Sequence, residues 1–231
     1  MEFSTGAIIG MEALLRWSSP VFGKVPPGEF IPLAEETGMI IPLSEWVLLQ
    51  ACTDNKRLLD EGYPPLMVSI NISFVHIAQS NFVETITKIL ERTSLPPHLL
   101  CLEITEHAAI QKMEQTSAHM KQLMNLGVRI ALDDFGVGNS SLSIIKSLPL
   151  NIIKIDRMFV KDIQHNEISS AIFHSILSLI EDLKLVSCVE GIELQEQYEL
   201  AMQHHCEMAQ GFHICRPILL SDLRSFLKKE S

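Results

Sequence analysis

The chain has 231 residues, of which 47% are hydrophobic, enough to bury one sizeable core in a single domain. Lys and Arg number 18 against 28 Asp and Glu, so the formal net charge is −10. This acidity argues against DNA or RNA as a partner, because neutralising a phosphate backbone needs clustered Lys and Arg. An anionic ligand would need a local source of positive charge, and bound metal ions are one candidate.

The five cysteines are expected to be free buried thiols of a reducing cytosol, because none forms a CxxC pair and several lie in apolar runs. No apolar run approaches the roughly 20 residues that a membrane span needs. The start of the chain lacks the basic and apolar regions of a secretion signal. We therefore expect a cytoplasmic protein with no membrane segment in this chain.

Short apolar runs alternate with longer amphipathic runs along the whole chain. The short runs are rich in Ile, Val and Leu, as parallel strands buried on both faces are: Ala7–Leu15, Met67–Ile72, Leu99–Ile104, Val128–Leu132, Ile152–Ile155, Leu185–Val189 and Ala209–Cys215. The helical patterns between them are Leu43–Glu61, Phe82–Arg92, Met113–Leu126, Ser169–Lys184, Leu194–His205 and Ser221–Lys229. This alternation predicts an α/β fold with a parallel sheet, and its repetition at this length favours a TIM-like (β/α)8 barrel.

A closed barrel of this kind has eight strands, whereas the pattern predicts seven. The missing strand would precede Ala7, because the chain begins almost directly on its first strand. We expect an open barrel with two unpaired sheet edges.

Polar residues recur at the carboxyl ends of the predicted strands, where the loops of a barrel converge on one mouth. Each has an ordinary explanation alone: Asp133-Asp134 before a glycine suits a turn, and Lys154 suits a salt-bridged strand residue. Together, acids on several strands would repel one another in one mouth, and a bound dication resolves that repulsion. The donors are oxygens, which favours Mg²⁺ or Mn²⁺ over zinc. A buried Lys154 beside them suits holding a water or stabilising phosphate charge, so these residues favour metal-dependent phosphodiester hydrolysis. His204 and His205 are interpreted as helix-surface residues.

The segment Glu12–Arg16 reads Glu-Ala-Leu-Leu-Arg and resembles the signature of EAL domains, the phosphodiesterases of the bacterial second messenger cyclic di-GMP. The resemblance covers nearly the whole chain. It includes Asn71-Ile72-Ser73, Glu103-Ile104-Thr105-Glu106, Asp133-Asp134-Phe135-Gly136, Lys154-Ile155-Asp156-Arg157, Glu190-Gly191-Ile192-Glu193 and Gln210-Gly211-Phe212. Seven ordered motifs are far more specific than a lone Glu-Ala-Leu.

The resemblance implies two ions, Mg²⁺ or Mn²⁺, with Asp133 bridging them. The implied ligands are Glu12, Asn71, Glu103 and Asp133 for the first ion, and Asp133, Asp134 and Glu190 for the second. The implied catalytic residues are Lys154, which would contact the nucleophilic water, together with Glu190 and Glu106, the latter anchoring the loop after Asp134. The implied substrate-binding residues are Leu15, Arg16, Asp156, Glu193 and Gln210, the last also near the metal-site waters.

The implied reaction cuts one of the two phosphodiester bonds of cyclic di-GMP and leaves linear pGpG. The family also implies a homodimer and a sensory or diguanylate-cyclase-like domain upstream in a longer parent protein. Two alternatives stay open: a cyclic di-GMP receptor or protein-interaction module with weak or no turnover, and a barrel metalloenzyme with another substrate.

Two features depart from the family's pattern. The loop after the paired aspartates usually reads Asp-Asp-Phe-Gly-Thr-Gly-Tyr-Ser-Ser, whereas this chain has Val137 and Asn139 in place of the Thr and Tyr. Val lacks the hydroxyl, so one loop hydrogen bond is lost, which bears on metal affinity, rate and dimer coupling. The family also has a helix and a strand with a Tyr-Gln-Pro segment before the first strand, and we expect this chain to be a truncated fragment without them.

Overall fold

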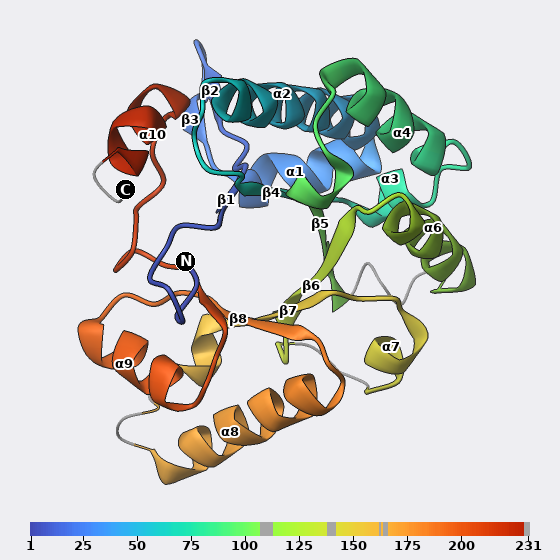
Figure 1. Ribbon diagram of the computed structural model, residues 1–231. Helices are drawn as coiled ribbons and strands as arrows, with labels where there is room; N and C mark the ends of the chain where they lie inside the picture. The colour runs from blue at the N-terminus through green and yellow to red at the C-terminus, as the bar shows by residue number, and fades with distance from the viewer. Residues whose placement is uncertain (107–112, 138–141, 162, 164–165, 229–231) are drawn as a thin grey trace.

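The computed structural model describes residues 1–231 except 107–112, 138–141, 162, 164–165 and 229–231. Within the described residues, seven strands form one parallel sheet whose strand order follows the chain. The sheet curls with its helices on the outside (Figure 1), which confirms the predicted TIM-like α/β class. Its strands are β1 (Gly10–Glu12), β4 (Met67–Asn71), β5 (Leu100–Thr105), β6 (Arg129–Phe135), β7 (Ile152–Ile155), β8 (Val186–Val189) and β9 (Met208–Ala209).

The helices follow local signals in the sequence. The side chain of Asn166 caps α8 by accepting the backbone N–H groups of Ile168 and Ser169. Gly62 and Gly127 follow α2 and α6 with φ of +88° and +98°, the left-handed conformation that often ends a helix. The α-helices are α1 (Pro27–Glu36), α2 (Ile40–Asp60), α3 (Phe74–Ile77), α4 (Phe82–Thr93), α6 (Met113–Asn125), α7 (Leu142–Ser147), α8 (Glu167–Asp182), α9 (Gln195–Gln203) and α10 (Leu220–Leu227), and two short 3-10 helices span Pro97–Leu99 and Arg157–Phe159.

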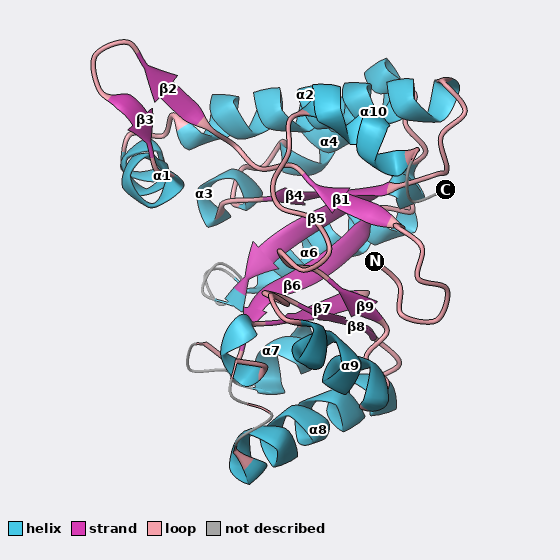
Figure 2. Cartoon of the chain, turned by 90° about the vertical axis from the view of Figure 1, so that its left-hand side faces the viewer, coloured by secondary structure: helices cyan, strands magenta, loops and turns pink. Residues whose placement is uncertain are grey.

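A β-hairpin made of β2 (Trp17–Ser19) and β3 (Gly23–Val25) projects from the barrel beside α1 (Figure 2). The Trp17 ring packs edge-on against Phe30 of α1, with 5.7 Å between ring centroids. The sequence pattern did not predict this hairpin or α1, because two three-residue strands and a proline-rich helix start leave no clear periodicity.

Two predictions about the last strand and the sheet edges need correction. The strand expected over Ala209–Cys215 is wrong beyond its first residue, because the chain turns at Gly211, whose carbonyl accepts the N–H of Cys215. The edge of β9 is also not unpaired. Glu2 forms an antiparallel bridge with Met208, and the Ala209 N–H donates to the Met1 carbonyl at 2.9 Å. An exposed strand edge needs such partners, and the first residues of the chain supply them.

A small apolar cluster fills the inside of the curl, with one residue from each of five neighbouring strands: Cys101, Ala131, Ile152, Cys188 and Met208. Because side chains alternate between the faces of a strand, the residue two positions later on each strand faces inward again. Those residues are Glu103, Asp133, Lys154, Glu190 and Gln210. A polar layer therefore lies directly above an apolar floor.

Cys52, Cys101, Cys188 and Cys206 are buried free thiols, as predicted, and Cys215 is partly exposed. Among the described residues, no helix is both long and apolar enough to cross a membrane.

Candidate metal centre

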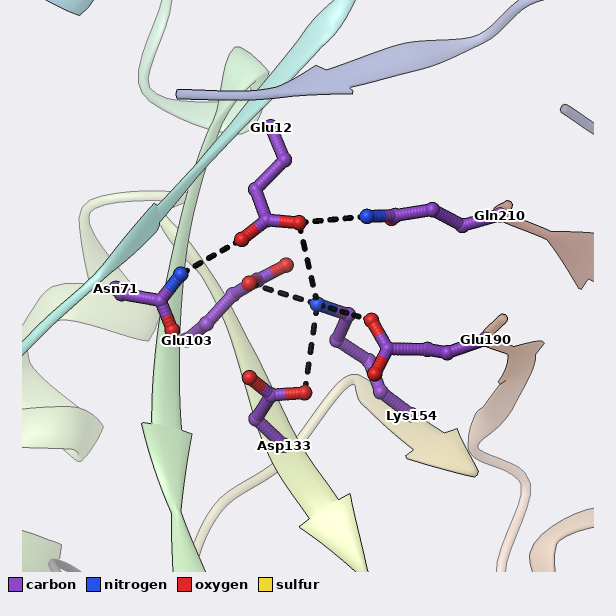
Figure 3. A network of polar contacts seen from close by, with 7 residues as sticks. All are labelled: Glu12, Asn71, Glu103, Asp133, Lys154, Glu190 and Gln210. Atoms are coloured by element: carbon purple, nitrogen blue, oxygen red, sulfur yellow. Dashed lines mark hydrogen bonds and ion pairs between the residues drawn. The ribbon is translucent and has the colours of Figure 1, made fainter. Parts of the chain in front are cut away.

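Seven polar side chains from separate strands meet in the polar layer at the mouth of the curl (Figure 3). They are Glu12, Asn71, Glu103, Asp133, Lys154, Glu190 and Gln210. Asn71 pairs directly with Glu103, whereas Asp133 pairs with Thr105, two residues after Glu103, so these side chains come from the carboxyl-terminal parts of neighbouring, staggered strands. The structure thus brings together seven of the residues that the sequence singled out.

Lys154 lies at the centre of this group, and its side chain is only 4% exposed. Its Nζ is 2.7 Å from both Glu103 Oε2 and Glu190 Oε1, 3.4 Å from Asp133 Oδ1 and 3.9 Å from Glu12 Oε2. Four carboxylates therefore face a single ammonium group. When all are ionised, three negative charges stay uncompensated within the group, which is the electrostatic signature of a cation site.

The pKa values of the acids reflect both their burial and this excess of negative charge. Burial raises the pKa of Glu103 to about 7 and that of Glu190 to about 8, although the nearby Lys154 ammonium acts in the opposite direction. Burial alone would lower the pKa of Lys154, but the surrounding carboxylates, Glu103 foremost, raise it above its ordinary value. Lys154 therefore stays charged, while two of its partners hold protons near neutral pH.

Glu12 is held from two sides. Gln210 Nε2 donates to Glu12 Oε2 at 2.6 Å, and Asn71 Nδ2 donates to Glu12 Oε1 at 2.7 Å. Because the amide nitrogen of Asn71 is used in this bond, its amide oxygen is the atom left to bind a cation. The carboxylate and the amide are thus oriented before any ion arrives.

Asp133, Asp134 and Glu190 each offer a carboxylate oxygen within 4.8 Å of the other two. Asp133 Oδ1 is buried and accepts no hydrogen bond from the described residues. Its described partner is Lys154 Nζ, in an ion pair at 3.4 Å. Burial, and then the charge of Asp133, raise the pKa of Asp134. An oxygen-only donor set with a buried oxygen that lacks a hydrogen bond fits a hard divalent cation such as Mg²⁺ or Mn²⁺.

The turn after the paired aspartates is tightly packed. Asp134 has φ of +54°, and Gly136 has φ of +95° and donates its N–H to Glu106 Oε1 at 3.1 Å. A Cβ on Gly136 would lie 2.4 Å from the ring of Phe159. This hydrogen bond joins the Glu106 carboxylate to the loop after Asp134. Val137 is 56% exposed, and Asn139 lies outside the described residues.

Of the expected substrate-binding residues, only Gln210 reaches the central group among the described contacts. Arg16 is exposed and donates to the carbonyl of Leu15 at 2.8 Å. Asp156 caps the 3-10 helix by accepting the Met158 N–H, and Glu193 is exposed. His204 and His205 follow the end of α9, where His204 contacts the rings of Phe173 and His174.

One contact near the site escaped sequence reasoning. The Ser73 hydroxyl donates to Glu35 Oε1 at 2.5 Å, which joins α1 to the end of β4. Glu35 carried no signal in the sequence, because the helix that presents it was not predicted.

The sequence model of the EAL domain family matches residues 1–217 of this chain. The chain belongs to the EAL domain family. Among its relatives is the bifunctional diguanylate cyclase/cyclic di-GMP phosphodiesterase MucR of Pseudomonas aeruginosa, 39% identical over 213 residues, which covers 92% of this chain and 31% of the relative. The cyclic di-GMP phosphodiesterase NbdA of the same organism is 36% identical over 228 residues, covering 99% of this chain and 29% of the relative.

Solved EAL structures share the fold. The PaMucR phosphodiesterase in complex with c-di-GMP superposes with a TM-score of 0.87 at 39% identity, covering 93% of this chain and 87% of that one. The EAL domain of Mycobacterium smegmatis DcpA gives 0.82 at 32% identity, covering 100% and 93%. This EAL chain spans about a third of the length of the curated relatives it matches.

Proposed function

We propose that this EAL domain hydrolyses one phosphodiester bond of cyclic di-GMP and releases linear pGpG, using two divalent ions, Mg²⁺ or Mn²⁺. The observation that carries the proposal is the ring of carboxylates around Lys154 Nζ, with contacts of 2.7 to 3.9 Å. The relative MucR, named as a cyclic di-GMP phosphodiesterase and solved as a c-di-GMP complex, supports the choice of substrate.

The proposed ligands divide into two overlapping groups. Glu12, Asn71, Glu103 and Asp133 would hold one ion, and Asp133, Asp134 and Glu190 the other. Bound ions would lower the pKa of a water molecule and offset the negative charge of the phosphate. The apolar floor formed by Cys101, Ala131, Ile152, Cys188 and Met208 closes the site from below, which strengthens these electrostatic interactions.

Lys154 and Glu106 would act as positioned groups around the reacting phosphate. The Lys154 ammonium, fully charged at neutral pH, would donate a hydrogen bond to the attacking water or to a phosphate oxygen and so orient it. Glu106 would keep the Asp134 carboxylate in place through the Gly136 N–H. Glu190 already contacts Lys154 Nζ, so the protonation state of each of the two groups would depend on that of the other.

The substrate would be held by Leu15, Arg16, Asp156, Glu193 and Gln210. Arg16 is exposed and bonds only to a neighbouring carbonyl among its described contacts, so its guanidinium group is available to swing onto a phosphate oxygen. Its positive charge would offset part of the negative charge of the ligand, in a chain whose own net charge is −10.

A second candidate function is a cyclic di-GMP receptor with weak or no turnover. The exposed Val137 favours it, because this position lacks the hydroxyl that the family's loop usually has next to the paired aspartates. We further propose a homodimer, and a sensory or diguanylate-cyclase-like domain in a longer parent protein. The longer parent protein is supported by MucR, which is named as bifunctional and of whose length this chain covers 31%.

The two candidates are separated by incubating the chain with cyclic di-GMP and Mn²⁺ or Mg²⁺ and looking for pGpG by chromatography. The phosphodiesterase predicts product that disappears on Glu12→Ala. The receptor predicts saturable binding of cyclic di-GMP with no product in either protein.

A further inference from the structure

Helix α1 is joined to the segment after β4 by the side chain of Glu35. Ser73 Oγ donates to Glu35 Oε1 at 2.5 Å, across 38 positions of the chain. Both side chains are partly buried, so water competes only partly for this hydrogen bond. A hydrogen bond to an ionised carboxylate is stronger than one between neutral groups. This contact is therefore a firm attachment between α1 and the segment that follows β4.

The segment fixed in this way carries a proposed metal ligand. Ser73 lies two residues after Asn71, and the residue between them, Ile72, donates its N–H to the Glu103 carbonyl at 2.9 Å. Asn71 itself is held by Glu12 Oε1. Residues 71, 72 and 73 are thus bonded to β1, β5 and α1 in turn. The partners on β1 and β5 are Glu12 and Glu103, two acids of the metal centre.

Only the Glu35 contact comes from outside the barrel strands. Without it, residues 71–73 would keep their bonds to β1 and β5 but lose the bond to α1, at the point where the chain enters the four-residue helix α3, which Ser73 caps through the Val75 N–H. Outer contacts that orient a ligand commonly change metal affinity by 10- to 100-fold when removed.

We propose that Glu35 is a positioning residue: through Ser73 it holds the Asn71 end of β4 and thereby sets the affinity of the metal centre. The inference rests on the proposed function for its metal ligands, but it concerns a residue that touches neither ion nor substrate.

The experiment measures Mn²⁺ affinity by calorimetry for the wild type and for Glu35→Ala, Glu35→Gln and Glu36→Ala. Glu36 is the matched control, because it is the exposed neighbouring acid on the same helix. Glu35→Ala should weaken Mn²⁺ binding roughly tenfold, whereas Glu35→Gln keeps an oxygen acceptor for Ser73 and should stay near the wild type. Saturating Mn²⁺ should restore most of the kcat of Glu35→Ala, as expected of a group that acts only through metal binding.

A second measurement does not depend on turnover. Amide hydrogen exchange over residues 71–77 should be faster in Glu35→Ala than in Glu36→Ala. If Glu35 acts through Ser73, combining Glu35→Ala with Ser73→Ala should not reduce Mn²⁺ affinity below that of the single variant that binds Mn²⁺ less tightly. Equal Mn²⁺ affinity and equal exchange in Glu35→Ala and Glu36→Ala would overturn the inference. A wild type that binds Mn²⁺ without cleaving cyclic di-GMP would instead overturn the proposed reaction alone, and one that binds no Mn²⁺ would overturn both.

Discussion

Lys154→Met tests whether the Lys154 ammonium group neutralises the surrounding carboxylates when no metal ion is bound. Methionine keeps a similar length but removes the charge that contacts Glu103 and Glu190 at 2.7 Å. Without metal, the variant should lose stability, because the buried carboxylates have no counter-charge. With metal, the ions would neutralise the same carboxylates and the loss should shrink.

The size of the effect follows from the geometry. At an effective dielectric constant near 20, each 2.7 Å contact is worth about 6 kcal/mol before the cost of burying the ammonium group is subtracted. That cost is several kcal/mol for each ion, and breaking a buried pair typically leaves a net loss of about 3–5 kcal/mol. At pH 6 the loss should be smaller, because Glu103 and Glu190, whose pKa values are already about 7 and 8, take up protons instead.

The assay is urea denaturation at pH 8 with EDTA or with excess Mn²⁺. The control is Lys146→Met, which removes an exposed lysine of α7 and should change the free energy of unfolding by no more than about 0.5 kcal/mol. A Lys154→Met variant as stable as the control in EDTA would refute the electrostatic reasoning. A loss that Mn²⁺ fails to reduce would show that ions do not neutralise these carboxylates.

Two further predictions concern pH and the aspartate turn. The folded-state pKa values of Glu103 and Glu190 are raised, so in EDTA the free energy of unfolding should fall as pH rises from about 5 to 8. The stabilisation by Mn²⁺ should grow over the same range, because the ion binds the deprotonated carboxylates. Thermal melts at each pH test this, and a Mn²⁺ effect independent of pH would contradict it. Gly136→Ala should cost about 1–2 kcal/mol for its positive φ and more for the 2.4 Å clash with Phe159, and it should weaken Mn²⁺ binding in calorimetry. Gly38→Ala shares the positive φ but meets no atom within 4 Å, so equal losses in the two variants would exclude the clash.

Much of the fold and site follows from two periodicities in the sequence. Alternating apolar runs and helical stripes predict the parallel sheet, and Ile152–Ile155 begins and ends where it was expected. The period of two along strands explains why Glu103 and Lys154 face the same interior, since each lies two residues after an inward-facing apolar residue. Polar residues at strand ends are therefore strong predictors of a shared site in this architecture.

The features that sequence reasoning missed depend on contacts between distant residues. The strand expected to end at Leu132 continues to Phe135, because pairing with Ile155 extends it through the two aspartates after a register shift. The β9 edge is covered by Met1–Phe3, a contact that no local pattern encodes. The Glu35–Ser73 hydrogen bond joins a helix without clear periodicity to a strand end, so only the folded chain reveals it.

The most direct test of the central claim is the conversion of cyclic di-GMP to pGpG by this chain with Mn²⁺ or Mg²⁺, followed by chromatography. The carboxylate ring predicts metal-dependent release of pGpG that EDTA abolishes and that is lost in Glu12→Ala. Tight binding of cyclic di-GMP with no pGpG, in a folded chain saturated with either ion, would contradict the claim.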